Sequence, residues 1–258
     1  MTDANPPAPR DLADYERAYA ESGFEVVQAA FRKRMLLELV ERLDPRRVLE
    51  VGCGADTLAN HWQASGQFTI IEPAPNFAAQ ARRDTADVAG VAVIEGTLEA
   101  LAPDMVRDGA DFDLILLSAL LHELADCDAL MAAVAGLCGP RTVVHDNVPN
   151  AHSMHRLLAL EMGLIGELTA ISPLQKTLQQ QRTFTLESLA AYATSGGFQV
   201  VDQGSYFIKP FTHAQMQELR QSGFLTPAML EGLWGLEKHM PGLGSEIYVN
   251  LRLAGDDT

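Results

Sequence analysis

Apolar runs alternate with amphipathic segments along the first 145 residues of the chain. The run at 112–117 is apolar without regular polar alternation, which is typical of a strand covered on both faces. A stripe at helical spacing joins Phe31, Met35 and Leu39, and Asp44-Pro45 ends it. The same pattern predicts strands at 48–51, 68–71, 91–94, 112–117 and 141–145, and helices at 31–43, 57–65, 76–84 and 126–137. This alternation indicates a parallel, doubly wound α/β sheet.

The second half of the chain is less regular but continues the sheet. Helices are predicted at 152–167, at 185–197 with Thr185 as the cap, and in two stretches within 212–240. Strands are predicted at 198–208 and at 246–253, the last with one exposed face because apolar and polar residues alternate. The polar, Pro-rich residues 1–10 are expected to form a disordered tail. Residues 11–258 are expected to form one domain, with 150–184 as a lid or substrate segment.

Net charge and composition limit the classes of molecule that the protein is expected to bind. The formal net charge is -15, and a strongly negative protein repels phosphate backbones. The basic clusters at 32–34 and 46–47 lie beside acids and are interpreted as a solvated helix face and the approach to a strand. No run of about 18 apolar residues is present, and the three cysteines are isolated. We therefore expect a soluble, cytoplasmic protein that binds neither nucleic acid nor membranes.

The candidate chemistry begins at Gly52-Cys53-Gly54, directly after the first predicted strand. Glycines at a strand-to-helix turn let a ligand approach the backbone closely, and the next helix offers free N–H groups. Thr57 replaces the third glycine of the dinucleotide fingerprint. Glu50 would repel a pyrophosphate but suits a ligand that carries an ammonium and a sulfonium. Glu72 ends the next strand, where a carboxylate can accept hydrogen bonds from both ribose hydroxyls.

This turn resembles the first motif, E/D-x-G-x-G, of the class I S-adenosylmethionine (SAM)-dependent methyltransferases. The resemblance runs from about Arg47 to the C-terminus and includes the segments 95–99 and 118–123 after the third and fourth strands. It implies a Rossmann-like, seven-stranded sheet, mostly parallel with an antiparallel last strand, and helical cap elements at the N-terminus and after strand five. It also implies a SAM site formed by Glu50, Gly52, Cys53, Gly54, Glu72, Pro73, Gly96, Thr97, Leu98, Ser118 and His122.

The implied reaction is transfer of a methyl group from SAM to an oxygen or nitrogen of a small-molecule acceptor, with S-adenosylhomocysteine as the second product. Such an acceptor usually needs a base, a role suited to histidine. His152 and His155, which follow strand five, are the favoured bases, while His122 is a further candidate that is expected to pack against the cofactor. Each of these histidines has the alternative of a structural or surface role. Cys53 is interpreted as a small filler in the turn.

Contacts to the acceptor are expected from polar side chains after strand five. The expected residues are Asp146, Asn147, Asn150 and Arg156, with Tyr15 and Tyr19 either closing the pocket or packing within a helix. Catechol-type methyltransferases hold Mg²⁺ with an Asp-Asn pair and a third acid, but Ser118 stands in the place of that acid. No metal is therefore expected. Lys209-Pro210 is interpreted as a strand end.

Two other functional classes stay open at this point. A nicotinamide-dependent oxidoreductase uses a similar sheet, although Glu50 and the missing third glycine count against it. A SAM-binding regulatory protein without transfer activity is the second alternative. Apolar positions between 216 and 236 fit either helix faces in the core or contacts of a homodimer.

Overall fold

A single seven-stranded sheet organises the molecule. The computed structural model describes residues 12, 23–62, 66–177 and 179–255. The strands are β1 (Arg47–Val51), β2 (Gln67–Glu72), β3 (Val91–Glu95), β4 (Phe112–Ser118), β5 (Cys138–Pro149), β6 (Phe198–Tyr206) and β7 (Glu246–Leu253). Their order is β3-β2-β1-β4-β5-β7-β6, and β7 runs antiparallel to both of its neighbours. The predicted Rossmann-like sheet with an antiparallel last strand is therefore confirmed.

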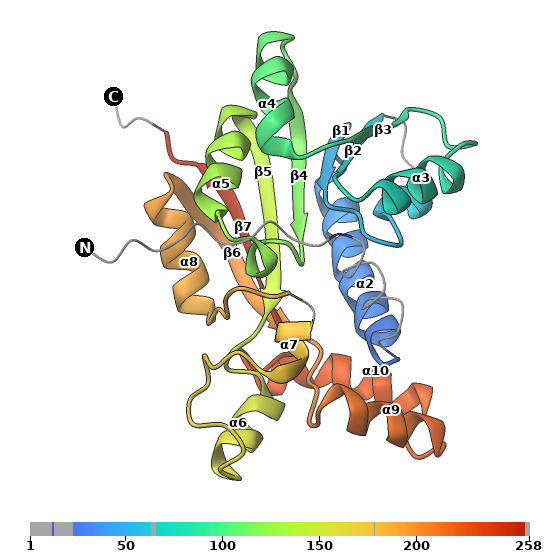
Figure 1. The fold of residues 1–258 in the computed structure, drawn as a ribbon, viewed down its shortest axis with the longest axis vertical. Coiled ribbons are helices and arrows are strands. Elements are labelled where there is room, and N and C mark those ends of the chain that lie inside the picture. The colour runs from blue at the N-terminus through green and yellow to red at the C-terminus, as the bar shows by residue number, and fades with distance from the viewer. Residues whose placement is uncertain (1–11, 13–22, 63–65, 178, 256–258) are drawn as a thin grey trace.

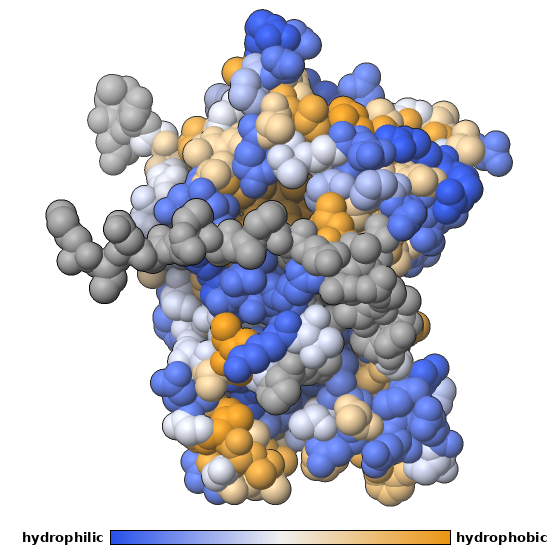
Figure 2. All heavy atoms as spheres, in the orientation of Figure 1, coloured by the Kyte–Doolittle hydropathy of each residue, from blue (hydrophilic) through white to orange (hydrophobic). Residues whose placement is uncertain are grey.

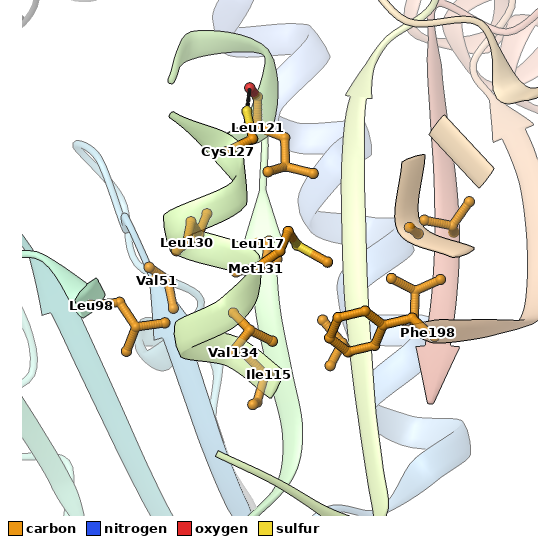
Figure 3. Packing of buried hydrophobic residues seen from close by; sticks show 14 of the residues in the cluster. Val51, Leu98, Ile115, Leu117, Leu121, Cys127, Leu130, Met131, Val134 and Phe198 are labelled. Carbon is orange, nitrogen blue, oxygen red and sulfur yellow. Dashed lines mark hydrogen bonds between the residues drawn. The ribbon is translucent and has the colours of Figure 1, made fainter. Parts of the chain in front are cut away.

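Helices cover both faces of this sheet (Figure 1). The helices α2 (Glu25–Leu43) and α3 (Pro75–Asp84) and the 3-10 turn η1 (Leu58–His61) pack on one face. The helices α4 (Leu98–Arg107), α5 (Cys127–Gly136) and α8 (Leu186–Ser195) pack on the other. Side chains of β4 alternate between the two cores, as Ile115 and Leu117 contact the α5 side while Leu114 and Leu116 contact the α2 side. Figure 3 shows the α5 side, where Met131 and Val134 pack toward the sheet.

A cap of helices lies beyond the C-terminal end of β4, which the arrowhead marks in Figure 1. It consists of α6 (Met154–Glu161), α7 (Pro173–Thr177), α9 (His213–Gln221), α10 (Pro227–Gly235) and the 3-10 turn η3 (Leu236–His239); the 3-10 turn η2 (Leu121–Glu123) follows β4. Aromatic rings join α2 to this cap, because Phe31 stacks on Phe207 at 4.3 Å and on Trp234 at 5.4 Å between centroids. The apolar positions of 216–236 contribute to this cluster within one chain.

Several sequence expectations need correction. The helix α4 was not predicted, and Pro103 lies inside it. The helix expected at 152–167 ends at Glu161, because Gly163 takes a left-handed conformation (φ +68°) that ends helices. Strand β5 runs over Cys138–Pro149 and so begins before and ends after the expected strand at 141–145. The last strand pairs with β5 and β6 along its two edges, and its residues on both faces are mostly buried, so the expected exposed face is absent.

The surface of the molecule is mostly polar in the view of Figure 2. Exposed apolar side chains include Leu158, Met162 and Leu164 at α6 and the loop after it. None of the helices in the described ranges is both long and apolar enough to cross a membrane. The predicted tail at 1–10, Tyr15 and Tyr19 lie outside the described residues.

Candidate active site

The glycine turn after β1 lies at the point where the strand order reverses, between β1 and β4. In open α/β sheets, ligands bind in the crevice beyond the strand ends at such a point. Gly52 and Gly54 have φ angles of +75° and +57°, which glycine adopts without steric cost. The Gly54 N–H donates to Glu72 Oε2 at 3.1 Å, and the Ala74 N–H donates to Glu72 Oε1 at 2.8 Å. The Glu72 carboxylate is thus held between two loops.

Glu50 is held by the turn that follows the glycines. The Thr57 hydroxyl donates to its carboxylate, and the Leu58 N–H donates to Glu50 Oε1 at 3.1 Å. Thr57 also caps η1 by accepting from the Ala59 N–H, so the residue that replaces the third glycine has a defined role. Burial raises the pKa of Glu50 to about 7, although these hydrogen bonds oppose the rise. A cation placed nearby would favour the ionised carboxylate.

A cavity of about 800 Å³, which we name the glycine-turn cavity, opens at this crevice. Seven predicted cofactor residues line it: Glu50, Gly52, Cys53, Gly54, Glu72, Pro73 and Ser118. The helix α2 lines it as well, and Lys33 on α2 reaches Asp56 and His61 across the loop. Burial raises the pKa of Cys53, which fits a filler rather than a nucleophile.

Three predicted cofactor residues line no described cavity. Leu98 is 1 % exposed and packs into the core, and Thr97 precedes it at the start of α4. The Gly96 N–H donates to the Glu72 carbonyl at 3.1 Å and so continues the β2–β3 ladder. Gly96 thus pairs with the strand end that carries Glu72, and the cofactor contact expected of these three residues stays a prediction.

A second cavity of about 460 Å³, the polar cavity, adjoins the first. Glu25, Arg32 and Ala119 line both cavities, so the two meet at the end of β4. Ala119 adopts a left-handed conformation (φ +55°), which is uncommon for a residue with a Cβ and tends to persist at functional sites. His122 lines the polar cavity and not the glycine-turn cavity, so its expected contact with the cofactor stays a prediction.

A buried ion network underlies the meeting point of the cavities. Glu246 accepts from Arg32 through Nε at 2.9 Å, from the Gln28 amide at 2.7 Å, from the Asn147 amide at 3.1 Å and from the Tyr206 hydroxyl. Burial alone would raise the pKa of Glu246, but the Arg32 guanidinium lowers it. Glu246 is therefore ionised at neutral pH, and Arg32 is fixed in place as a wall of both cavities.

Five buried polar atoms of the polar cavity have no hydrogen-bond partner within the described structure. They are His155 Nδ1, Gln180 Oε1, Thr183 Oγ1, Gln217 Oε1 and Ser245 Oγ. Buried polar groups without partners are uncommon in proteins and need an explanation. Burial lowers the pKa of His155 well below its usual value, and Lys209, His213 and Arg156 lower it further. Its imidazole is therefore neutral at pH 7.

Arg156 and Asn150 line the polar cavity but use their polar groups within the chain. Arg156 donates to the Leu168 carbonyl from Nε at 2.9 Å and from Nη2 at 2.7 Å, and to the Ala170 carbonyl at 2.6 Å. The Asn150 amide donates to the carbonyls of Gly242 and Gly244. Arg156 thus ties the 168–175 part of the 150–184 segment over the cavity.

Three predicted residues lie away from both cavities. His152 donates its backbone N–H to Asn150 and is near Glu187 on α8. Asp146 and Asn147 are neighbours on β5, and their side chains point to opposite faces of the sheet. Asn147 belongs to the Glu246 network, while Asp146 is enclosed on the other face. In the described ranges, no group of three or more His, Cys, Asp or Glu side chains is placed to hold a metal.

Sequence reasoning missed the charged residues of the polar cavity. Arg32 was interpreted as part of a solvated helix face, but its side chain is only 15 % exposed. Lys209 was interpreted as a strand end, but it is 2 % exposed and lines the cavity together with His213. No local pattern in the sequence marks either residue, because a charge on a helix or at a strand end is compatible with a solvated position.

The sheet topology and a switch-point crevice with a glycine turn and two acids define a Rossmann-like, nucleoside-binding enzyme. Residues 19–203 match the family described as a methyltransferase domain, which is more than half of the chain, so the protein belongs to this family and is a SAM-dependent methyltransferase. The nicotinamide-dependent alternative is therefore set aside. A search of curated proteins finds no match.

Solved structures share the fold at low sequence identity. A SAM-dependent methyltransferase of Thermotoga maritima, described as a possible histamine N-methyltransferase, has a TM-score of 0.58 and 15 % identity, covering 93 % of this chain and 98 % of that one. The N-methyltransferase NodS of Bradyrhizobium japonicum, in complex with S-adenosylhomocysteine, has a TM-score of 0.55 and 12 % identity, covering 94 % and 99 %. The mitomycin 7-O-methyltransferase MmcR has a TM-score of 0.50 and 14 % identity, covering 94 % and 54 %. At these identities the likeness shows the fold alone.

Proposed function

We propose that this methyltransferase binds SAM in the glycine-turn cavity and methylates an oxygen or nitrogen of a small molecule held in the polar cavity. The observation that carries the proposal is the shared boundary of the two cavities at Glu25, Arg32 and Ala119. A methyl donor and its acceptor must be adjacent and in line, and two cavities that meet at one place provide that arrangement.

The residues of the glycine-turn cavity fit SAM. Glu72 would hold the ribose hydroxyls, because its two oxygens are already oriented by the N–H groups of Gly54 and Ala74. Glu50, at the carboxyl end of β1, would favour the positively charged end of the molecule. When bound, SAM supplies a methyl group that its sulfonium has already activated. The chain's main tasks are then to align the acceptor and to exclude water.

His155 is the candidate base for the proton of the acceptor. It lines the polar cavity, and its Nδ1 has no partner among the described residues. Its imidazole is neutral, so Nδ1 can offer a lone pair to the acceptor's proton, although the lowered pKa makes it a weaker base than an ordinary histidine. As the acceptor atom bonds to the methyl group, its O–H or N–H proton would pass to His155 Nδ1. Removal of a positioned base typically lowers a rate by about 10²–10⁴-fold.

The test compares His155→Gln with the matched variant His152→Gln, since His152 lies outside both cavities. Formation of S-adenosylhomocysteine is measured with a panel of hydroxyl and amine acceptors, and SAM affinity is measured by calorimetry. We expect His155→Gln to lose most of the turnover at unchanged SAM affinity, and His152→Gln to keep both. Full turnover in His155→Gln would show that the reaction uses another base or none.

A further inference from the structure

Lys209 is a buried cation that lines the polar cavity, and no carboxylate among the residues that the structure describes is in contact with it. Its side chain is 2 % exposed, and its ammonium donates to two neutral atoms, Gln28 Oε1 at 3.1 Å and His213 Nδ1 at 2.9 Å. An ammonium has three donors, so one remains without a partner in the described structure. Buried charges are normally paired, because an unpaired charge pays a large desolvation penalty.

The acids near Lys209 are already bound to other groups. Glu25 accepts from Arg32 at 3.0 Å and contacts His213 Nε2 at 3.1 Å, while Glu246 is held by Arg32, Gln28, Asn147 and Tyr206. The charged and titratable groups that interact with Lys209 are Glu25 and Arg32 on α2, Glu246 on β7, His213 on α9 and His155 on α6. Arg156 on α6 lines the same cavity. With both histidines neutral, these described groups are three cations and two carboxylates, so one positive charge has no carboxylate to pair with.

The backbone before Lys209 is strained in a way that fixes this side chain. Phe207 adopts φ +57°, a conformation that bulky residues rarely take. Its ring is stacked on Phe31, and its carbonyl accepts from the Ser245 N–H at 2.8 Å. Strain of this kind persists where the surroundings enforce it and often marks a functional site. The bend carries the chain from β6 to the wall of the cavity at Lys209.

We propose that the acceptor is a small molecule with a carboxylate group, which binds the free N–H of the Lys209 ammonium in the polar cavity. This inference rests on the proposed function, since it assigns the cavity to the acceptor. The unpartnered oxygens of Gln180, Thr183, Gln217 and Ser245 would bind further polar groups of the same molecule. SAM also carries a carboxylate, but Lys209 lines the polar cavity and not the glycine-turn cavity.

The first test uses the unaltered protein, with and without saturating S-adenosylhomocysteine. Binding of benzoate and hexanoate is compared with that of benzamide and hexanamide by calorimetry from pH 6.5 to 9.5. A charge-assisted hydrogen bond predicts carboxylates about tenfold or more tighter than amides. Burial lowers the pKa of Lys209 to about 8, so this preference should decline at alkaline pH as the ammonium loses its proton. Equal binding of acids and amides, or no binding of either acid, overturns the proposal.

The second test compares Lys209→Met and Lys209→Gln with Lys238→Met, because Lys238 is exposed on η3. Both Lys209 variants should lose the carboxylate preference and keep SAM affinity, and Lys238→Met should keep both. A preference that survives in Lys209→Met overturns the proposal. Weaker SAM binding in the Lys209 variants also overturns it, because the ammonium would then serve the cofactor. If the unaltered protein does not bind SAM, that result contradicts the proposed function. The comparison of carboxylates with amides in the absence of S-adenosylhomocysteine then still tests the role of Lys209.

Discussion

Glu72 shows how one residue at a strand end is prepared for a ligand. Two backbone N–H groups orient its carboxylate, and burial raises its pKa. Ribose hydroxyls that donate to this carboxylate would make charge-assisted hydrogen bonds, and we expect their loss to cost about 1.5–3 kcal/mol in total. We expect Glu72→Ala to weaken SAM binding by about one to two orders of magnitude in calorimetry. Glu95→Ala is the matched control, because Glu95 ends the next strand and is about half exposed. Equal losses in the two variants would contradict the assignment of Glu72.

Individual residues also show which contacts cannot be predicted from the sequence. The residues of the glycine turn are contiguous, so their spacing identified them together with Glu50 and Glu72. Arg32 and Glu246 are 214 positions apart, and nothing in the local pattern of either segment indicates that they meet. A charged residue next to an apolar strand looks the same whether it is solvated or paired. Lys209 and Arg32 were therefore misread, and His152 and His155 could not be told apart.

At the scale of elements, the 150–184 segment depends on Arg156. This side chain on α6 donates to the carbonyls of Leu168 and Ala170 and to Gln175 on α7. Arg156→Met should free that segment, because it removes these bonds while keeping an apolar stem of similar length. We expect faster hydrogen exchange at 168–175 and a raised KM for the acceptor, with SAM affinity unchanged. Arg141→Met, at an exposed position of β5, is the control. Unchanged exchange in Arg156→Met would show that other contacts hold the segment.

The elements themselves were largely predictable where apolar periodicity was strong. All seven strands were expected, since a strand between two helical layers is a short apolar run. The helix α4 was missed, because Pro103 and the adjacent acids hide its apolar face, on which Leu98 and Ala102 are buried. The burial of β7 on both sides was missed because its polar residues suggested an exposed face. In the structure Glu246 and Asn250 are buried and hydrogen-bonded.

For the whole molecule, Asp146 should make stability depend on pH. It is enclosed, neither of its oxygens has a described partner, and burial raises its pKa well above the ordinary value. The folded state therefore favours the protonated acid, and this contribution is lost as pH rises from the unfolded pKa of about 4 through the raised folded value. The free energy of unfolding is measured by urea titration for the unaltered protein and for Asp146→Asn. Between pH 5 and pH 9, the value for the unaltered protein should fall relative to that of Asp146→Asn.

The matched control for this measurement is Asp108→Asn, because the Asp108 side chain is 73 % exposed. Its stability difference from the unaltered protein should not change with pH. The pKa values of Glu25 and Glu246 are lowered, so these residues change the free energy of unfolding only at acid pH. All three proteins contain both residues, and their contributions therefore cancel when the stabilities are compared. Parallel stability curves for the unaltered protein and Asp146→Asn would show that Asp146 is hydrated or ionised in the folded state.

The position of β7 between β5 and β6 has a consequence for synthesis of the protein. Residues 246–253 leave the ribosome after every other strand, and until then β6 has no neighbour to pair with in the sheet. Arg32 is translated more than 200 residues earlier, and its ion pair with Glu246 can form only once β7 has been synthesised. The Glu246 network beside the polar cavity can therefore form only after residues 246–253 have been translated.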